Sequence, residues 1–249
     1  MGLKESGLRG SLRNVSVGID AIPDSAIHQY LVNDFTTSNW PDSVGTSDIE
    51  TISGLTEDST AFDSVGGVSG DGIDDFGESD TMGDFGSNML SDWAISIPIQ
   101  TTDDASVPFG LNDQSNNMVL YGVVGDLFDV YDTGVLGLRV RGADSNQYRV
   151  HTNEAYNDGN PHHWIINKTG NSDGDLEMYV DDMETAESMT TVTSGTLTEA
   201  ENFTDPMSYF RRGGNEDNHF EGALGDVRWF NDSLDQSDRQ AVHDALDWT

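Results

Sequence analysis

The sequence predicts an all-β protein folded as one antiparallel β-sandwich. Short apolar runs that alternate with a period of two recur along the 249 residues, and clusters of Gly, Asn and Asp separate most of them. Such alternation puts successive side chains on opposite faces of a strand. No helical pattern is interleaved with these runs, and about a dozen short strands in this order are typical of a sandwich. The 27 glycines suit the many turns that short strands require.

Residues 1–24 differ from the rest and are predicted to form an N-terminal arm for attachment and assembly, with the sandwich domain spanning residues 25–249. Before Asp20, three basic residues stand against one acid, a net charge of +2 in a chain of −34. Because salt screens charge, we expect leucines to supply most of the docking by apolar burial. The residues expected to contact a partner are Leu3, Lys4, Leu8, Arg9, Leu12 and Arg13.

The strands are predicted from residue 26 onward. The run IHQYLVNDF at 27–35 leads into the turn NWPDSVG at 39–45. The run DWAISIPIQ at 92–100 alternates most clearly, since Trp93, Ile95 and Ile97 share one face with Ile99, and the residues between them share the other. Further strands are expected at 117–124, 126–132, 134–142, 146–152, 162–168, 175–182 and 222–230.

One helix is predicted near the end of the chain, over residues 233–246 (SLDQSDRQAVHDAL). Ser233 followed three residues later by Gln236 matches a capping box, which favours a helix start at this point. Apolar residues including Leu234, Val242 and Leu246 form a stripe along one side. We therefore expect this helix to pack one face against the sandwich.

The charge is strongly acidic and is spread along the whole chain, with 45 Asp and Glu against 11 Lys and Arg. Such a surface repels itself unless salt screens it, and in molar salt the Debye length shrinks to about 3 Å. The composition therefore indicates a halophilic protein. Nucleic acid is excluded as a partner because no basic stripe is available to displace counterions. The chain has no cysteine for disulfides or thiolate metal sites, and no apolar run long enough to insert into a membrane.

Four motifs resemble, in the right order, the laminin-G-like branch of the concanavalin A-like jelly rolls. They are NDFTTSNWPDSVG (33–45), GVSGDGIDDF (67–76), NDGNPHHWIINKTGNSDGDLEMYVDD (157–182) and FEGALGDVRWFNDSLDQSDRQAV (220–242). Together they cover the chain from about residue 26 to 248. Two positions depart from the pattern: Asp182 stands where Gly is usual, and Pro161 where an aromatic is common. The resemblance implies a jelly-roll sandwich of the lectin-like class.

The adjacent histidines of the third motif raise the question of a metal site. His162, Trp164 and Ile166 should point one way along the strand, while His163 and Ile165 point the other. Two side chains on opposite faces of a sheet cannot grip one ion together. We therefore expect one packed, hydrogen-bonded histidine and one surface histidine.

Enzymatic activity is not predicted. Laminarinase-type glycoside hydrolases share the jelly roll, but the resemblance to them would require carboxylates spaced as E-x-D-x-x-E or E-x-D-x-E on one strand, and neither pattern occurs. No G-x-S-x-G nucleophile elbow is present, and GGVSGDG lacks the Lys-Ser/Thr ending of a phosphate loop.

A structural calcium ion is a hypothesis taken from the resemblance, because many jelly rolls of this type hold one between the opening strand, the first loop and the closing strand. Calcium prefers six to eight oxygen ligands, which Asp side chains and loop carbonyls supply. The positions that match are Asp34 and Asp226. Ordinary acidic surface residues are the competing interpretation.

Sugar binding would use aromatic rings together with convergent polar groups. Tyr121, Tyr131 and Tyr156 are the candidates, with Trp164 beside them, although each is equally suited to the core.

The predicted function is that of a non-enzymatic structural or adhesion protein of a halophilic virus particle, in the tail, baseplate, fibre or capsid surface. Its partners would be other virion proteins in an oligomeric assembly, and a host glycan or surface protein. The alternative is a secreted or cell-surface carbohydrate-binding module of a haloarchaeon. The virion is preferred because the N-terminus lacks a secretory signal and begins with a short basic arm. Fold class alone does not decide between them.

Overall fold

The computed structural model describes residues 22–82, 85, 87–127, 131–201, 203–213 and 218–246. The predicted contact residues of the arm, from Leu3 to Arg13, lie outside these ranges. Within them, no helix is both long enough and apolar enough to cross a membrane.

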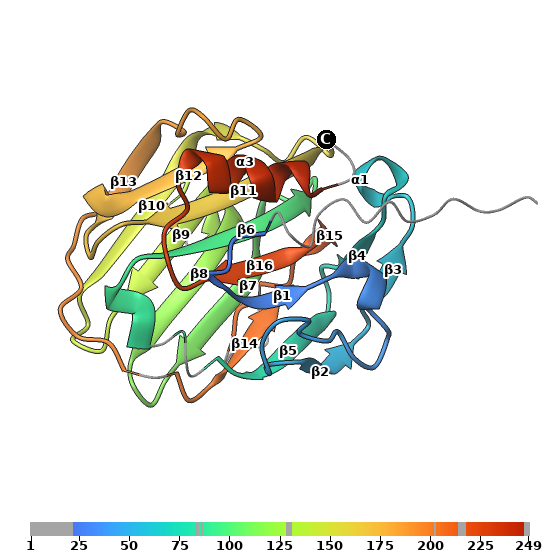
Figure 1. Cartoon of the computed structure of the whole chain (residues 1–249), viewed down its shortest axis with the longest axis horizontal. Helices are drawn as coiled ribbons and strands as arrows, with labels where there is room; N and C mark the ends of the chain where they lie inside the picture. The colour runs from blue at the N-terminus through green and yellow to red at the C-terminus, as the bar shows by residue number, and fades with distance from the viewer. Residues whose placement is uncertain are drawn as a thin grey trace, which may run out of the picture.

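Two antiparallel sheets pack face to face, which confirms the predicted all-β sandwich (Figure 1). The first sheet has the order β1 (Ala26–Tyr30), β16 (Val227–Phe230), β6 (Trp93–Gln100), β15 (Glu221–Leu224), β4 (Gly67–Asp71) and β3 (Thr56–Asp58), and β6 also pairs with β11 (Pro161–Lys168), which pairs with β12 (Leu176–Val180). The second sheet has the order β13 (Met189–Thr193), β10 (Gln147–Ala155), β9 (Val135–Arg141), β8 (Met118–Gly125), β7 (Ala105–Asp113), β14 (Pro206–Tyr209), β5 (Phe76–Thr81) and β2 (Ile49–Ser53).

The main core lies between the sheets and follows the predicted alternation. Trp93, Ile95, Ile97 and Ile99 of β6 are all buried in it. Trp229 of β16 contributes ring contacts with Phe85 and Phe109, both edge-to-face. Each large apolar side chain that is fully buried contributes about 1.5–3 kcal/mol to the stability of the fold. This core therefore holds the two sheets together in their observed packing.

The outer face of the first sheet is covered by the C-terminal helix α3 (Gln236–Asp244), which crosses β11 and β12 (Figure 1). Ile165 and Tyr179 pack there against Leu234 and Val242 in a second apolar cluster. The predicted helix is therefore present, although shorter than 233–246. The predicted Ser233 and Gln236 capping box is wrong: Asp235 is the N-cap, and its carboxylate accepts the N–H of Asp238 at 2.9 Å.

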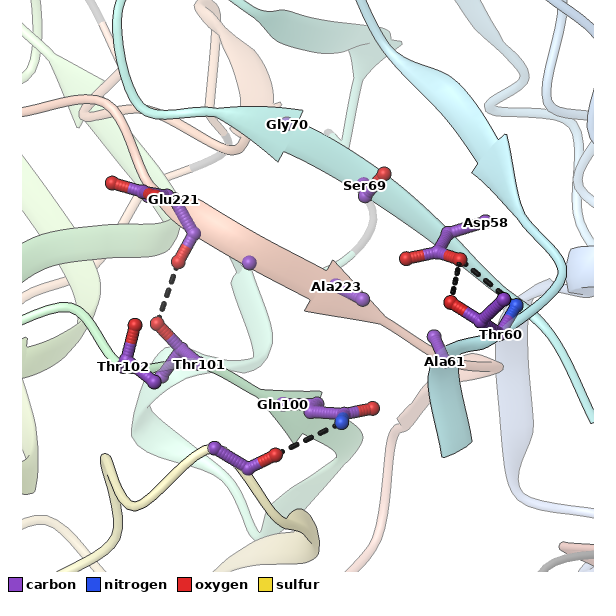
Figure 2. A pocket seen from close by; sticks show the side chains of 12 residues that line it. Asp58, Thr60, Ala61, Ser69, Gly70, Gln100, Thr101, Thr102, Glu221 and Ala223 are labelled. Atoms are coloured by element: carbon purple, nitrogen blue, oxygen red, sulfur yellow. Dashed lines mark hydrogen bonds between the residues drawn. The ribbon is translucent and has the colours of Figure 1, made fainter. Parts of the chain in front are cut away.

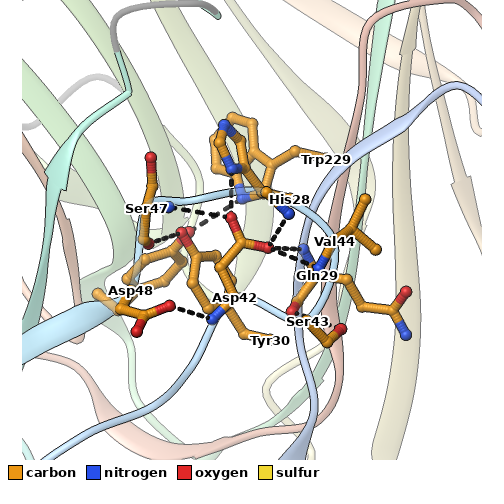
Figure 3. Close-up of polar contacts among 11 residues, drawn as sticks. His28, Gln29, Tyr30, Asp42, Ser43, Val44, Ser47, Asp48 and Trp229 are labelled. Atoms are coloured by element: carbon orange, nitrogen blue, oxygen red, sulfur yellow. Dashed lines mark hydrogen bonds and ion pairs between the residues drawn. The ribbon is translucent and has the colours of Figure 1, made fainter.

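The predicted opening turn is present and is organised by one carboxylate. Asp42 Oδ1 accepts the backbone N–H groups of Gln29 and Gly45, each at 2.9 Å, and Oδ2 lies 2.6 Å from His28 Nδ1 (Figure 3). The predicted run 27–35 divides here, since β1 ends at Tyr30 and a 3-10 turn, η2 (Val32–Asp34), follows. The other short helices among the described residues are α1 (Ala61–Ser64), η3 (Ser87–Leu90) and η5 (Asp173–Asp175).

The strand predicted at 126–132 is wrong, because the described residues of this segment belong to no strand. Leu127 and Tyr131 instead pack with Val107, Val123 and Val135 in a small cluster apart from the main core. Alternating apolar residues also suit a loop that folds back over a sheet, and here the loop covers part of the outer face of the second sheet.

Candidate ligand-binding face

Arginine side chains gather on the outer face of the second sheet. Arg139 of β9 stands between Leu138 and Val140, which both belong to the main core. Because side chains alternate along a strand, Arg139 points away from the core. Arg149 of β10 follows the same rule, since its neighbours are also core residues.

Strand register brings these residues into one line. Arg139 lies directly opposite Tyr121 of β8 on one side and directly opposite Arg149 on the other. Thr193 of β13 follows Arg149, and Gly110 of β7 follows Tyr121. Directly opposite residues have Cβ atoms about 4.5–5.5 Å apart. We call Tyr121, Arg139 and Arg149 the Tyr–Arg row.

The row is held in place by contacts with neighbouring side chains. Arg139 donates from Nε and Nη2 to Gln147 Oε1, at 3.3 and 3.2 Å, and its guanidinium lies 6.0 Å from the centre of the Tyr121 ring. Arg212 lies 5.3 Å from that centre and donates from Nε to the Tyr121 hydroxyl at 3.1 Å. Gly110 leaves room for the ring, since a Cβ there would lie 2.9 Å from Tyr121 Cδ1.

The positive charge of the row has no acidic partner among the described residues. The ion pairs that these residues form lie elsewhere, and neither Arg139 nor Arg149 takes part in one. The Nε of Arg149 is buried without a hydrogen-bond partner there. Burial, followed by the nearby charge of Arg149, lowers the pKa of Arg139. Four of the chain's 11 basic residues lie on or against this face: Arg139, Arg141, Arg149 and Arg212.

Two of the three predicted glycan-binding tyrosines border this arginine group. Tyr121 is part of the row, and Tyr131 lies over Gly137 of β9, where a Cβ would be 3.1 Å from Tyr131 Cε1. Burial raises the pKa of Tyr131 to about 12, while the charges of Arg149 and Arg139 oppose that rise. Tyr121 and Tyr131 are only 1% and 5% exposed, so their rings support the arginines rather than offering a bare stacking surface.

The other two predicted sugar-binding aromatics, Tyr156 and Trp164, do not lie on the outer face of the second sheet. Tyr156 contacts the His162 ring edge-to-face at 5.1 Å, and Trp164 is fully buried in the main core. The arginines of this face were not predicted from the sequence. For Arg139 and Arg141 a signal was present, as basic residues at alternate positions in GLRVRG (137–142), within a chain that has few basic residues.

The adjacent histidines face opposite sides of the sheet, as predicted. His163 is fully buried, and its Nε2 lies 2.8 Å from Ser96 Oγ. His162 lies on the other face, with Nδ1 2.7 Å from Asp181 Oδ2 and Nε2 3.1 Å from Asp158 Oδ1. Both are structural residues of the hairpin.

The two carboxylates predicted to bind calcium come from the opening and closing segments of the chain, which meet at the η2 turn. Asp34 is exposed on η2, and Asp226 Oδ1 accepts the N–H of Val32 in the same turn at 2.8 Å. Asp226 Oδ2 accepts from Arg228 at 3.0 Å, so a guanidinium already occupies that oxygen. The calcium hypothesis stays a prediction, and its test is whether chelator lowers the melting temperature at fixed ionic strength.

One group of three carboxylates does occur among the described residues, formed by Asp71, Asp74 and Asp75 in the GDGIDDF loop. Their ligand atoms lie within 4.8 Å of one another. Asp75 Oδ2 accepts the N–H of Asp71 at 2.8 Å, and burial, aided by Asp71 and Asp74, raises the pKa of Asp75. A chelation experiment therefore includes both Asp71→Asn and Asp226→Ala. The variant whose melting temperature no longer responds to chelator shows which carboxylates bind the ion.

A polar hollow of about 340 Å³ lies on the outer face of the first sheet (Figure 2). Gln100 and Thr101 line it but hold neighbouring loops, through hydrogen bonds to the carbonyls of Gly159 at 2.9 Å and Glu221 at 2.5 Å. Asp58 Oδ1 accepts the hydroxyl of Thr60 at 2.7 Å and so is also engaged locally. Among the described residues, no aromatic ring and no basic side chain lines this hollow, so it offers less to a sugar than the Tyr–Arg row does.

Comparisons with solved structures show that the fold is shared by domains of carbohydrate-acting and carbohydrate-binding proteins. Domain 4 of AbnA, a GH43 extracellular arabinanase from Geobacillus stearothermophilus solved with arabinotriose, has a TM-score of 0.57 at 12% identity; the match covers 86% of this chain and 96% of that one. The binding domain of botulinum neurotoxin DC in complex with SialylT has a TM-score of 0.61 at 12% identity, over 91% of this chain and 52% of that one.

A sialidase from Trypanosoma rangeli, solved with 2,3-difluorosialic acid, has a TM-score of 0.59 at 12% identity, over 91% of this chain but only 34% of that one. The chain thus spans about half of the toxin binding domain and a third of the sialidase. No family model and no curated protein matches the sequence. At these identities the likeness establishes the β-sandwich fold and no residue correspondence.

Proposed function

We propose that this protein is a glycan-binding module that acts without cleaving its ligand, through the outer face of the second sheet. The observation that carries the proposal is the Tyr–Arg row, in which half-buried guanidinium groups are lined up by strand register on a rigid surface. Guanidinium groups present several N–H donors in a fixed planar arrangement, which suits sugar oxygens. Two of the similar structures contain arabinotriose and SialylT, which supports the same ligand class.

The test is a glycan array read in molar salt, followed by saturation-transfer NMR on the sugars that bind. We expect Arg139→Gln and Arg149→Gln to weaken binding at least tenfold. Gln236→Glu, on the exposed helix that covers the first sheet, makes the same charge change at a distance and should leave binding unchanged. Binding that survives both arginine substitutions would move the site away from this face. Release of reducing ends from the bound glycan would contradict the non-enzymatic assignment.

The setting of this activity is a separate part of the proposal. We infer that the module works outside the cell in a high-salt environment, as a component of a halophilic virus particle that attaches to its host. Its support is the net charge of −34 spread over the chain. A secreted or cell-surface module is the alternative. Mass spectrometry of purified particles decides, since the chain must be present in stoichiometric amount if it is a virion protein.

A further inference from the structure

The Tyr–Arg row contains an arrangement that sheets normally avoid. Arg139 and Arg149 are directly opposite each other on adjacent strands. Like charges at such positions are destabilising, because the side chains lie within a few ångströms and share one face. In a chain with 45 acidic residues, a carboxylate beside either arginine would have been easy to supply. Among the described residues none lies within ion-pair distance of them.

The hydrogen-bond donors of the pair are also only partly used. Arg139 gives two N–H groups to the neutral amide oxygen of Gln147, and a guanidinium has five. Arg149 makes no side-chain hydrogen bond or ion pair with the described residues, and its Nε is buried without a partner among them. Leaving a buried charged donor unpaired is destabilising, because the donor has lost its hydrogen bonds to water and gained none in return. An anion that accepts from both side chains would remove both penalties.

We propose that the glycan is acidic, and that a sugar carboxylate binds between Arg139 and Arg149. This inference rests on the proposed function and names its ligand class. A planar carboxylate matches the guanidinium fork with paired hydrogen bonds. Long-range attraction is screened within about 3 Å at molar salt, so only such short, directed contacts would select an acidic ligand in brine.

The experiment compares tri-galacturonate with its methyl ester, which keeps the sugar rings and removes the negative charge. Binding is measured by calorimetry in molar KCl and again at the lowest salt at which the protein stays folded. We expect the acid to bind at least tenfold more tightly than the ester in molar KCl. Arg149→Gln should abolish that preference, while Arg149→Lys, which keeps the charge but loses the fork, should retain only part of it.

The outcomes separate this inference from the proposed function. Equal binding of acid and ester means that the protein binds glycans but that the acidic assignment is wrong. If neither trisaccharide nor any array glycan binds, the proposed function itself fails. A preference for a sulfated over a carboxylated sugar would also overturn the inference. Self-association is measured by sedimentation in the same buffers. If the wild type self-associates and Arg149→Gln does not, the face receives the acidic surface of a second copy and the acidic-glycan inference is wrong.

Folding of the variants is checked independently. Because Arg149→Gln removes one of two facing like charges, its melting temperature without ligand should equal or exceed that of the wild type. Adding tri-galacturonate should raise the melting temperature of the wild type only. A marked loss of stability in Arg149→Gln would mean that the arginine is a structural residue, and the binding inference would then be withdrawn.

Discussion

His163 and His243 meet where the C-terminal helix packs on the first sheet. Their Nδ1 atoms are 2.9 Å apart, and the rings stack at an interplanar angle of 11°. One Nδ1 must carry a hydrogen and the other must accept it, so the contact requires at least one neutral ring. Burial is the main cause that lowers the pKa of both, and His243 and Arg228 add to the effect on His163.

These shifts make the attachment of the helix dependent on pH. Because both folded-state pKa values lie below 6.5, the unfolded chain binds more protons just below that pH. The stabilisation is therefore complete above about pH 6.5 and falls as the pH drops, by at most about 1.4 kcal/mol per pH unit for each ring. His162 acts in the opposite sense: its pKa is raised by Asp181 and Asp158 although burial opposes this, so its contribution is lost as pH rises.

We predict that the melting temperature of the wild type falls between pH 7.5 and pH 5.5, and that the double change His163→Gln with His243→Gln flattens this fall. The slope is compared within each variant, because the substitutions also change stability at neutral pH. His162→Gln is the matched control and should make the fall steeper. An unchanged slope in the double variant would show that the stacked pair does not titrate in this range.

The sequence predicted part of this arrangement. Period-two alternation was enough to place His162 and His163 on opposite faces, because it depends only on backbone geometry. That His163 would meet His243 could not be predicted, since the contact depends on how a helix 80 positions later lies across β11.

At the scale of the elements, the turn after β1 requires glycine at position 45 for steric reasons. A Cβ on Gly45 would clash with the Asp42 carboxylate and the Ile27 carbonyl, and would lie 2.7 Å from His28 Nδ1. Burial alone would raise the pKa of Asp42, but hydrogen bonds from His28 and from the Gln29 and Gly45 backbone hold it at about 2. The carboxylate thus stays ionised and keeps the turn closed.

Gly45→Ala should therefore destabilise the protein by about 1–3 kcal/mol, the usual cost of overpacking. Val44→Ala, at a 51% exposed position in the same turn, should change stability by less than about 0.5 kcal/mol. Urea unfolding in high salt measures both. Equal stability of the two variants would mean that the turn opens freely and that Asp42 does not fix it.

The segment 126–132 shows the limit of pattern reading for an element. Its alternation fits a strand, yet the described part lies over the outer face of the second sheet, where Leu127 and Tyr131 cover Val123. A strand would also place Leu127 and Tyr131 on one face, since they are four residues apart. Only the choice of neighbouring strands distinguishes the two conformations, and the strand pairing β7–β8–β9–β10 is already complete without this segment.

At the scale of the whole molecule, the candidate site depends on long-range pairing. The row joins strands β8, β9 and β10, and β7 and β13 extend it on either side. Composition predicted the acidic surface, and periodicity predicted the sandwich. Which arginine faces which tyrosine follows from register, and one residue of slippage would reverse every face.

The charge of the whole chain leads to the last prediction. A net charge of −34 opposes the compact state, and four of the 11 basic residues are concentrated on or against one face instead of being dispersed among the acids. Moving the protein from about 2 M salt to well below 0.1 M lengthens the Debye length beyond about 10 Å, so repulsion between distant carboxylates returns. We expect the near-ultraviolet circular dichroism of the buried tryptophans to be lost in this range. The transfer is repeated at pH 4.5, where part of the carboxylate charge is neutralised, in the double variant His163→Gln with His243→Gln, because the stacked histidines of the wild type would themselves lose stability at that pH. If acid repulsion is the cause, the signal is lost at a lower salt concentration at pH 4.5 than at pH 7.5. An unchanged salt dependence would assign the requirement to ion-specific binding instead.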